Sequence, residues 1–328
     1  SPTLPRRPMR GRHLFVTTLL ALASTPAHAL LRAPINSIVQ SRVVASPAIQ
    51  SRVLSSPVAI APLPSVGVLA TASVVPTLLG FWKTEYGVSY AYGSAMAAIG
   101  TLVLPAASSP LARAHALVLV LYGIRLNAFL LYREIFIPRF QKFREKIEER
   151  TKAKGNRLSR TPFVLGCSFL YYCMGAPLLL TATAAPPTSA LLKVETALMY
   201  LGFLIAALGD LQKSIVKATK GEDALVTNGI YKFLRHPNYT GELLLWGASF
   251  AAAVTVAPAI LAAATMSKLA VAGWLLASAT GYAGIAFVLI QAATGLEKKQ
   301  KDKYGAGDGK GGGPYEKWVA TSWAGPTK

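Results

Sequence analysis

Acidic residues are missing from the first quarter of the chain, since no Asp or Glu precedes Glu85. Charged residues make up only 15% of the 328 residues, whereas about 25% is usual for soluble globular chains. Only two cysteines occur, Cys167 and Cys173, and they lie in an apolar segment. This scarcity argues against a disulfide framework and against a metal site, so we expect no bound metal.

Apolar residues and basic residues dominate what is present. Hydrophobic residues account for 52% of the chain, and the formal net charge is +20, from 34 Lys and Arg against 14 Asp and Glu. A nucleic-acid-binding protein can carry such a charge. Here, however, the basic residues lie in short runs between apolar segments, which is typical of loops on one side of a bilayer. The composition therefore predicts an integral membrane protein that contacts lipid and binds no nucleic acid.

The first 65 residues have the composition of a targeting segment. In residues 1–29, Arg10 and Arg12 precede an apolar run over 14–23, and small residues follow at 27 and 29, which is the layout of a signal peptide. Residues 30–65 contain Arg, Ser and Ala but no acid, like a transit peptide. Together they resemble the two-part address of proteins that enter plastids of secondary origin. The alternative is a signal anchor with a disordered tail, and in that case the protein would lie in the endoplasmic reticulum membrane.

The remainder, residues 66–328, is predicted to form one all-α domain, a polytopic bundle of about seven transmembrane helices. A span needs roughly 20 mostly apolar residues. Gly and Pro residues interrupt the first two candidates, which are therefore the weakest. The candidate spans are 66–82, 86–106, 111–136, 163–185, 190–209, 238–260 and 268–293.

Three basic regions set the expected orientation of this bundle. Residues 138–160 hold nine Lys and Arg against three Glu, and residues 210–236 and the tail from Glu297 are also basic. Two spans separate each basic region from the next, so all three fall on one side. Basic loops face the cytoplasm, or the stroma of a plastid, and we expect the active-site loops on that side.

A basic loop runs into an apolar helix at residues 235–242, the most informative stretch of the chain. Pro237 suits the first turn of a helix, because its missing N–H would be unpaired there anyway. Arg235 and His236 then lie beside the free N–H groups of that helix end, which attract anions. Asn238 and Glu242 follow on one face of the helix and enter a membrane-length apolar run. An ionisable residue there is a candidate functional residue.

The preceding linker adds further polar groups to this end. Asp210 and Lys213 are neighbours on a helix, and Asn228-Gly229 is a good turn pair before Tyr231. A polyanionic ligand can be bound by Lys213 and Arg235, since Arg forms paired hydrogen bonds to phosphate while Lys acts as a point charge. The alternative is that such side chains only reach toward lipid headgroups, which we favour for Lys232.

The order and spacing of these residues resemble the steroid 5-alpha-reductase-like membrane proteins. The resemblance is strong over about 205–250, where it is most similar to the bacterial and plant branch described as a domain of unknown function. It is weaker over 123–126 and in the tail, where Tyr304 and Tyr315 look similar to the family's ending. The matching residues are Asp210, Gln212, Lys213, Gly229, Tyr231, Arg235, His236, Pro237, Asn238, Tyr239, Gly241, Glu242, Trp246 and Ala248.

The resemblance implies an oxidoreductase of lipid metabolism that binds NADPH and reduces a carbon–carbon double bond conjugated to a carbonyl. The substrate would be a lipophilic small molecule, steroid-like or isoprenoid-like. The proton donor has no secure match, and Tyr132 and Glu134 are the nearest guesses. The cofactor pocket would be lined by Asp210, Lys213, Tyr231, Arg235, His236, Asn238, Tyr239 and Glu242. Of these, Glu242 would orient the cofactor or fix Arg235.

Two alternatives remain. Isoprenylcysteine carboxyl methyltransferases and related membrane enzymes share an Arg-His-Pro-x-Tyr-x-Gly motif, bind S-adenosylmethionine, and have a later Glu for which Glu297 would stand here. Asn238, Glu242 and the Asp-x-Gln-Lys pattern at 210–213 suit the reductase-like branch better. A non-catalytic membrane protein that keeps the fold is the third possibility. The sequence does not determine the substrate or the oligomeric state.

Overall fold

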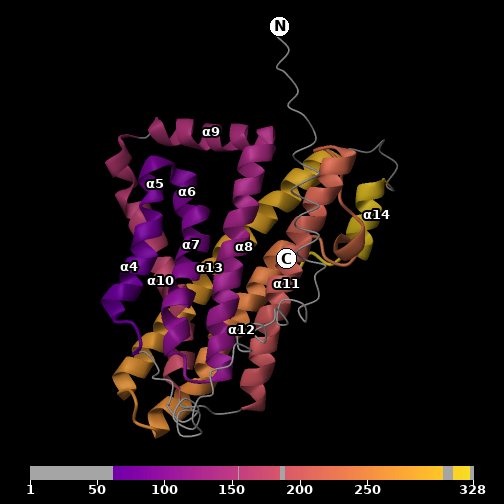
Figure 1. Cartoon of the computed structure of the whole chain (residues 1–328). Coiled ribbons are helices and arrows are strands. Elements are labelled where there is room, and N and C mark those ends of the chain that lie inside the picture. The colour runs from indigo at the N-terminus through magenta and orange to yellow at the C-terminus, as the bar shows by residue number, and fades with distance from the viewer. Residues whose placement is uncertain (1–61, 154, 185–188, 306–312, 326–328) are drawn as a thin grey trace, which may run out of the picture. The chain divides into compact units, whose positions relative to one another are not determined.

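The computed structural model describes residues 62–153, 155–184, 189–305 and 313–325, which fall in the second of two compact units, Ile60–Lys328. This part of the chain is helical and contains no strand, as predicted (Figure 1). The expected signal-peptide-like segment and nearly all of the transit-peptide-like segment lie outside the described residues. The helices are α4 (Val66–Thr77), α5 (Leu79–Trp82), α6 (Thr84–Val88), α7 (Tyr90–Val103), η2 (Leu104–Ala106), α8 (Pro110–Phe136), α9 (Pro138–Lys152), η3 (Arg157–Arg160), α10 (Thr161–Thr183), α11 (Ala190–Lys220), η4 (Gly229–Lys232), α12 (Pro237–Ala262), α13 (Lys268–Tyr304) and α14 (Pro314–Thr321).

Six helical segments are long and apolar enough to cross a membrane, which supports an integral membrane protein. The first expected span is different, because Val66–Trp82 is a shorter apolar segment. It divides at Leu78 into α4, which contains Pro76, and α5. The six segments are Thr84–Ala106, Pro110–Phe136, Arg157–Thr183, Ala190–Lys220, Pro237–Ala262 and Lys268–Tyr304.

The three basic regions meet at one end of the bundle, as predicted from the span count. Arg139 of α9 lies 3.4 Å from the carboxylate of Asp223, which belongs to the α11–α12 connection. Lys303, near the end of α13, forms an ion pair with the same carboxylate. These exposed pairs add little stability, but they place α9, the connection and the end of α13 together.

Helices α11 and α12 approach each other closely because glycine replaces a side chain on both. A Cβ atom on Gly202 would lie 2.5 Å from the carbonyl oxygen of Gly241, and a Cβ atom on Gly241 would collide with Gly202 in return. No larger residue fits this contact without moving the helices apart. The contact fixes the Arg-His-Pro end of α12 against the polar end of α11.

Helix α9 lies across the ends of the long helices in Figure 1, and the buried Arg144 anchors it. The Nε atom of Arg144 is 2.8 Å from Glu85, and its Nη1 atom pairs with Glu134. The hydroxyl groups of Tyr86 and Tyr90 also donate to Glu134. Arg144 therefore joins α6, α8 and α9 through two carboxylates.

We expect Arg144→Met to lower the free energy of unfolding by about 3 kcal/mol, because it removes the cation from two partly buried carboxylates and leaves Glu134 only the Nζ atom of Lys83 at 4.0 Å. Thermal unfolding of the purified full chain in detergent measures the loss. Lys142→Met is the matched control, since Lys142 is exposed on the same helix. Equal melting temperatures for the two variants would contradict this role of Arg144.

Candidate functional site

The carboxylate of Glu242 lies in the interior of the bundle, one helical turn after Asn238 on α12. It accepts hydrogen bonds from the hydroxyl of Tyr122 on α8 at 2.8 Å and from that of Tyr92 on α7 at 3.3 Å. All three residues are buried. A carboxylate at membrane depth is costly unless it is hydrogen-bonded, and these two tyrosines meet that need. We name Glu242, Tyr122 and Tyr92 the carboxylate cluster.

Aromatic rings enclose the carboxylate cluster. The indole of Trp246 packs edge-on against Tyr122, with ring centroids 5.3 Å apart, and Tyr171 stacks on Tyr92 at 5.5 Å. The indole nitrogen is buried and lies near the Tyr92 hydroxyl without completing a hydrogen bond. Since indole can only donate, this N–H is available to an oxygen atom of a ligand.

Glu242 does not fix Arg235, so that part of the sequence-based interpretation is wrong. The partner of Arg235 is Glu297 of α13, whose Oε1 atom lies 2.7 Å from the Arg235 Nε atom. The same oxygen lies 2.8 Å from Nε2 of His236. The two residues at the start of α12 therefore share one carboxylate from α13.

The tautomer of His236 follows from this contact. Glu297 is paired with Arg235, and a carboxylate only accepts, so Nε2 of His236 carries the hydrogen. Burial lowers the pKa of His236 from its ordinary value of 6.5, although the hydrogen bond to Glu297 opposes the shift. The neutral ring then has a lone pair on Nδ1, which is buried without a partner in the described part of the chain. A hydrogen-bond donor on a ligand would satisfy it.

The C-terminal segment is attached to the same motif. Nη1 of Arg235 donates to the carbonyl oxygen of Val319 at 3.1 Å and to that of Ser322 at 2.5 Å. The Trp318 indole donates to the carbonyl of Tyr231 at 2.6 Å. The Tyr231 hydroxyl in turn donates to the carbonyl of Gly209 at 3.1 Å. The polar groups of Tyr231 are thus used within the protein, as are Nε and Nη1 of Arg235.

The acidic residue of the α11 motif also has a protein partner. Asp210 forms an ion pair with Arg125 of α8, which additionally donates to the Ala206 carbonyl at 2.7 Å. Gln212 holds the turn that follows, because its side chain accepts from the backbone N–H of Ile230 at 3.1 Å. The second terminal nitrogen of Arg125 is buried and lacks a hydrogen-bond partner among the described residues.

Two cations at this end form no ion pair among the described residues, although the carboxylate of Asp210 is near both. Arg133 of α8 stacks on the ring of Phe140 at 3.9 Å, and its charge interacts with that of Lys213. Neither forms an ion pair or a hydrogen bond within the described ranges, and both are half-buried. Tyr239 is near enough for its phenol to interact with Arg133 and Asp210. We name Arg133, Lys213, Asn238 and Tyr239 the cationic mouth.

The structure thus brings together most of the expected site residues, but not the guessed acids. Glu134 is held by Arg144 and two tyrosines, and Tyr132 is buried with its ring 5.5 Å from that of Phe136. Sequence reasoning missed Tyr122 and Arg133. Arg133 carried a signal, because a charged residue in a membrane-length apolar segment is a candidate by default; a tyrosine in such a segment does not stand out.

A metal site is not formed by the described residues, which contain no group of three His, Cys, Asp or Glu side chains suited to an ion. A family model described as protein of unknown function (DUF1295) matches residues 78–301. No curated protein and no solved structure matches the chain. The matched range includes the carboxylate cluster, the cationic mouth and Glu297, and it ends before α14.

The lowered pKa of His236 predicts a pH dependence of stability. Above about pH 6.5 the His236 ring is neutral in both the folded and the unfolded chain. Below that pH the unfolded chain binds a proton more readily than the folded chain, so the free energy of unfolding decreases as the pH falls. We expect the melting temperature to drop less between pH 7.5 and 5.5 in His236→Gln than in the wild type. An equal drop would show that His236 titrates alike in both states.

Proposed function

We propose that this chain, which belongs to the DUF1295 family, is a membrane-embedded reductase that uses NADPH to saturate a carbon–carbon double bond conjugated to a carbonyl in a lipophilic substrate. The observation that carries the proposal is the carboxylate cluster. It offers a titratable group and hydroxyl groups deep in an apolar bundle, next to an indole N–H that completes no hydrogen bond within the part of the chain that the structure describes. General acid catalysis in a water-poor site needs such groups.

The residues of the cationic mouth suit the phosphate groups of NADPH. Arg133 and Lys213 are half-buried, lie close to each other and form no ion pair within the described residues, since the nearby Asp210 is paired with Arg125. Phosphate oxygens would provide the missing counter-charge. His236 Nδ1 is a buried acceptor, which matches a hydroxyl or amide donor of a nucleotide. Bound NADPH would supply a hydride to the β-carbon of the substrate.

The distance between the mouth and the cluster also suits this chemistry. Glu242 follows Asn238 by four residues on α12, which is roughly 6 Å of helix. A cofactor whose phosphates lie at the mouth can therefore extend its reactive ring toward the cluster. We infer that the Tyr122 hydroxyl polarises the substrate carbonyl and protonates its oxygen as hydride is added to the β-carbon, and the enol so formed tautomerises to the saturated ketone. In its protonated form Glu242 would pass a proton to the Tyr122 oxygen as that hydroxyl gives up its own.

An S-adenosylmethionine-dependent methyltransferase is the second candidate, and one observation favours it. Glu297 meets the Arg-His pair directly, at 2.7 Å and 2.8 Å, as expected if this later Glu acts with the motif. Methyl transfer to a carboxylate, however, gives no role to a buried carboxyl group and two tyrosines. We therefore place the reductase first. The proposed location remains a plastid or endoplasmic reticulum membrane, with the mouth on the stromal or cytoplasmic side.

Titration of the purified full chain with NADPH and with S-adenosylmethionine separates the candidates. We expect NADPH at 100 times its Kd to stabilise the folded state by about 2.7 kcal/mol, and Lys213→Met to weaken NADPH binding at least tenfold. Lys232→Met is the matched control, because Lys232 is an exposed lysine on η4. Stabilisation by S-adenosylmethionine alone would make the protein a methyltransferase, and stabilisation by neither would favour a non-catalytic role.

Tyr122→Phe tests the proton donor. We expect a loss of about 10²- to 10⁴-fold in kcat, the usual contribution of a general acid, with NADPH binding changed less than twofold. The rate of enone-dependent NADPH oxidation and the NADPH titration measure the two effects. Tyr200→Phe is the control, since its hydroxyl donates only to the Ala114 carbonyl at 2.9 Å. A similar kcat loss in both variants would remove Tyr122 from the reaction.

A further inference from the structure

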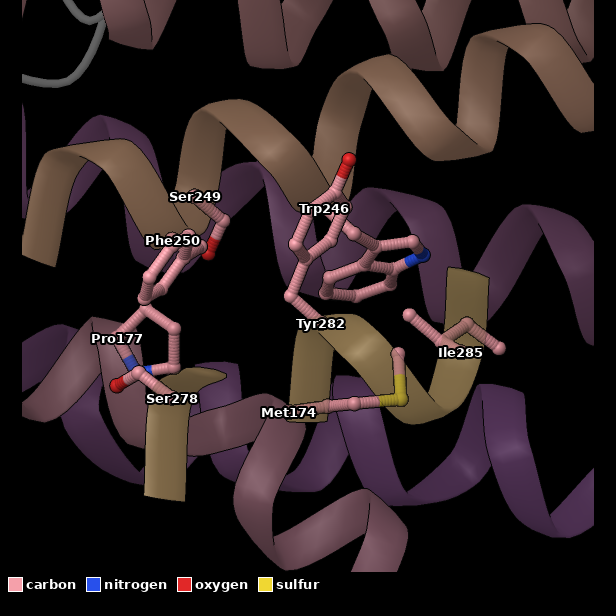
Figure 2. A pocket seen from close by; sticks show the side chains of 8 residues that line it. All are labelled: Met174, Pro177, Trp246, Ser249, Phe250, Ser278, Tyr282 and Ile285. Atoms are coloured by element: carbon pink, nitrogen blue, oxygen red, sulfur yellow. The ribbon is translucent and has the colours of Figure 1, made fainter. Parts of the chain in front are cut away.

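A small cavity lies between α10, α12 and α13, beyond Trp246 when α12 is followed away from the mouth (Figure 2). Its volume is about 10 Å³, which is near the space that one water-sized group requires. Ser249 and Ser278 supply hydroxyl groups to its wall, and Pro177 is among the apolar residues around them. In the view of Figure 2 these three occupy one half of the cavity, and Trp246 and Ile285 the other.

The hydrogen on the Ser249 hydroxyl points away from this cavity, toward His115. Thr181 has one hydroxyl hydrogen, which it donates to the Leu178 carbonyl at 3.0 Å. Nδ1 of His115 lies 2.9 Å from the same hydroxyl oxygen, and we assign the imidazole as the donor there, because the threonine hydrogen is then free to bond to the carbonyl. Among the described residues no carboxylate contacts this buried ring, and a charged ring without a counter-ion is costly at membrane depth.

It follows that Nε2 of His115 is an acceptor, because a neutral imidazole carries only one N–H. The Ser249 oxygen lies 2.9 Å from Nε2, so the serine donates its hydrogen to the ring. Ser278 likewise donates to the Trp274 carbonyl at 2.7 Å. Both serine oxygens have used their hydrogen inside the protein, and they therefore present only lone pairs to the cavity.

We propose that this cavity binds a hydroxyl group of the lipophilic substrate, an inference that rests on the proposed reductase function. A hydroxyl fits the volume and can donate to Ser249 or Ser278. A carbonyl oxygen in the same place would face two lone-pair-bearing oxygens. Ser249 follows Glu242 by seven residues on nearly the same face of α12, a rise of roughly 10 Å. The substrate would thus carry a hydroxyl about 10 Å from the carbonyl that meets the carboxylate cluster.

Binding of three matched compounds to the full chain in detergent tests the proposal without any turnover. The compounds are a rigid fused-ring enone with a hydroxyl about 10 Å from its carbonyl, the analogue with hydrogen in that place, and the analogue with a ketone there. We expect the wild type to bind the hydroxyl compound three- to tenfold more tightly than either analogue, which is about the net value of one neutral hydrogen bond.

Ser249→Ala and Ser278→Ala should each reduce this preference to less than twofold, and Ser249→Thr should keep most of it. The matched control is Ser73→Ala, because Ser73 is also a buried serine that donates to the carbonyl four residues earlier, at 3.1 Å, but lies on α4. The hydroxyl site is supported if Ser73→Ala keeps the wild-type preference for the hydroxyl compound while the two cavity variants lose it.

Equal binding of the three compounds by the wild type would mean that the cavity holds a resident water only, and it would overturn the proposal. An unchanged preference in both cavity variants, or no binding of any compound, would overturn it as well. The NADPH titration reports separately on the reductase. If NADPH binds while the compounds bind equally, the hydroxyl site alone fails; if NADPH does not bind, the reductase assignment fails first.

Discussion

The ion pair between Arg235 and Glu297 is the interaction on which this end of the molecule depends. It joins the first residues of α12 to α13, and the same arginine binds two carbonyl groups of the C-terminal segment. A buried guanidinium is tolerated only when its N–H groups are satisfied, so these three parts of the chain must come together. His236 is thereby fixed with its Nδ1 lone pair uncommitted, and Tyr231 is locked under α14 by Trp318.

The polar residues fall into two groups: those whose ion pairs stabilise the bundle, and those that form no ion pair within the described residues. Asp210, Glu134 and Glu297 each neutralise an arginine. By contrast, Arg133 and Lys213 form no ion pair within the described residues, and Glu242 has tyrosine hydroxyls in place of a cation. Groups that cost free energy to bury and do not pair with each other are expected where a ligand completes the site. Arg133 belongs to α8, Lys213 to α11 and Glu242 to α12, so these groups come together from three different helices.

Much of this site could be read from residues 205–250, because its members are close in sequence and share helix faces. The Arg-His-Pro start of α12, the Asn238–Glu242 face and the basic end of the bundle are all as predicted. The roles of individual residues were harder to predict. Arg235 was expected to bind the cofactor, yet its Nε and Nη1 groups bind Glu297 and the C-terminal segment. Glu134 was a candidate acid, yet it forms an ion pair with Arg144. A motif shows which side chains are available, but it does not show which ones the protein itself uses.

The sequence alone determined six of the membrane-length helices and placed the basic regions at one end of the bundle. Apolar runs of membrane length, proline at a helix start and the placement of basic loops act through neighbouring residues, so they can be read locally. Only the tertiary structure decided the partners of the buried groups. Tyr122 and Tyr92 lie 120 and 150 residues before Glu242, and His115 lies 134 residues before Ser249. Contacts over such separations depend on how whole helices pack, and the close approach at Gly202 and Gly241 is one of the constraints that set that packing.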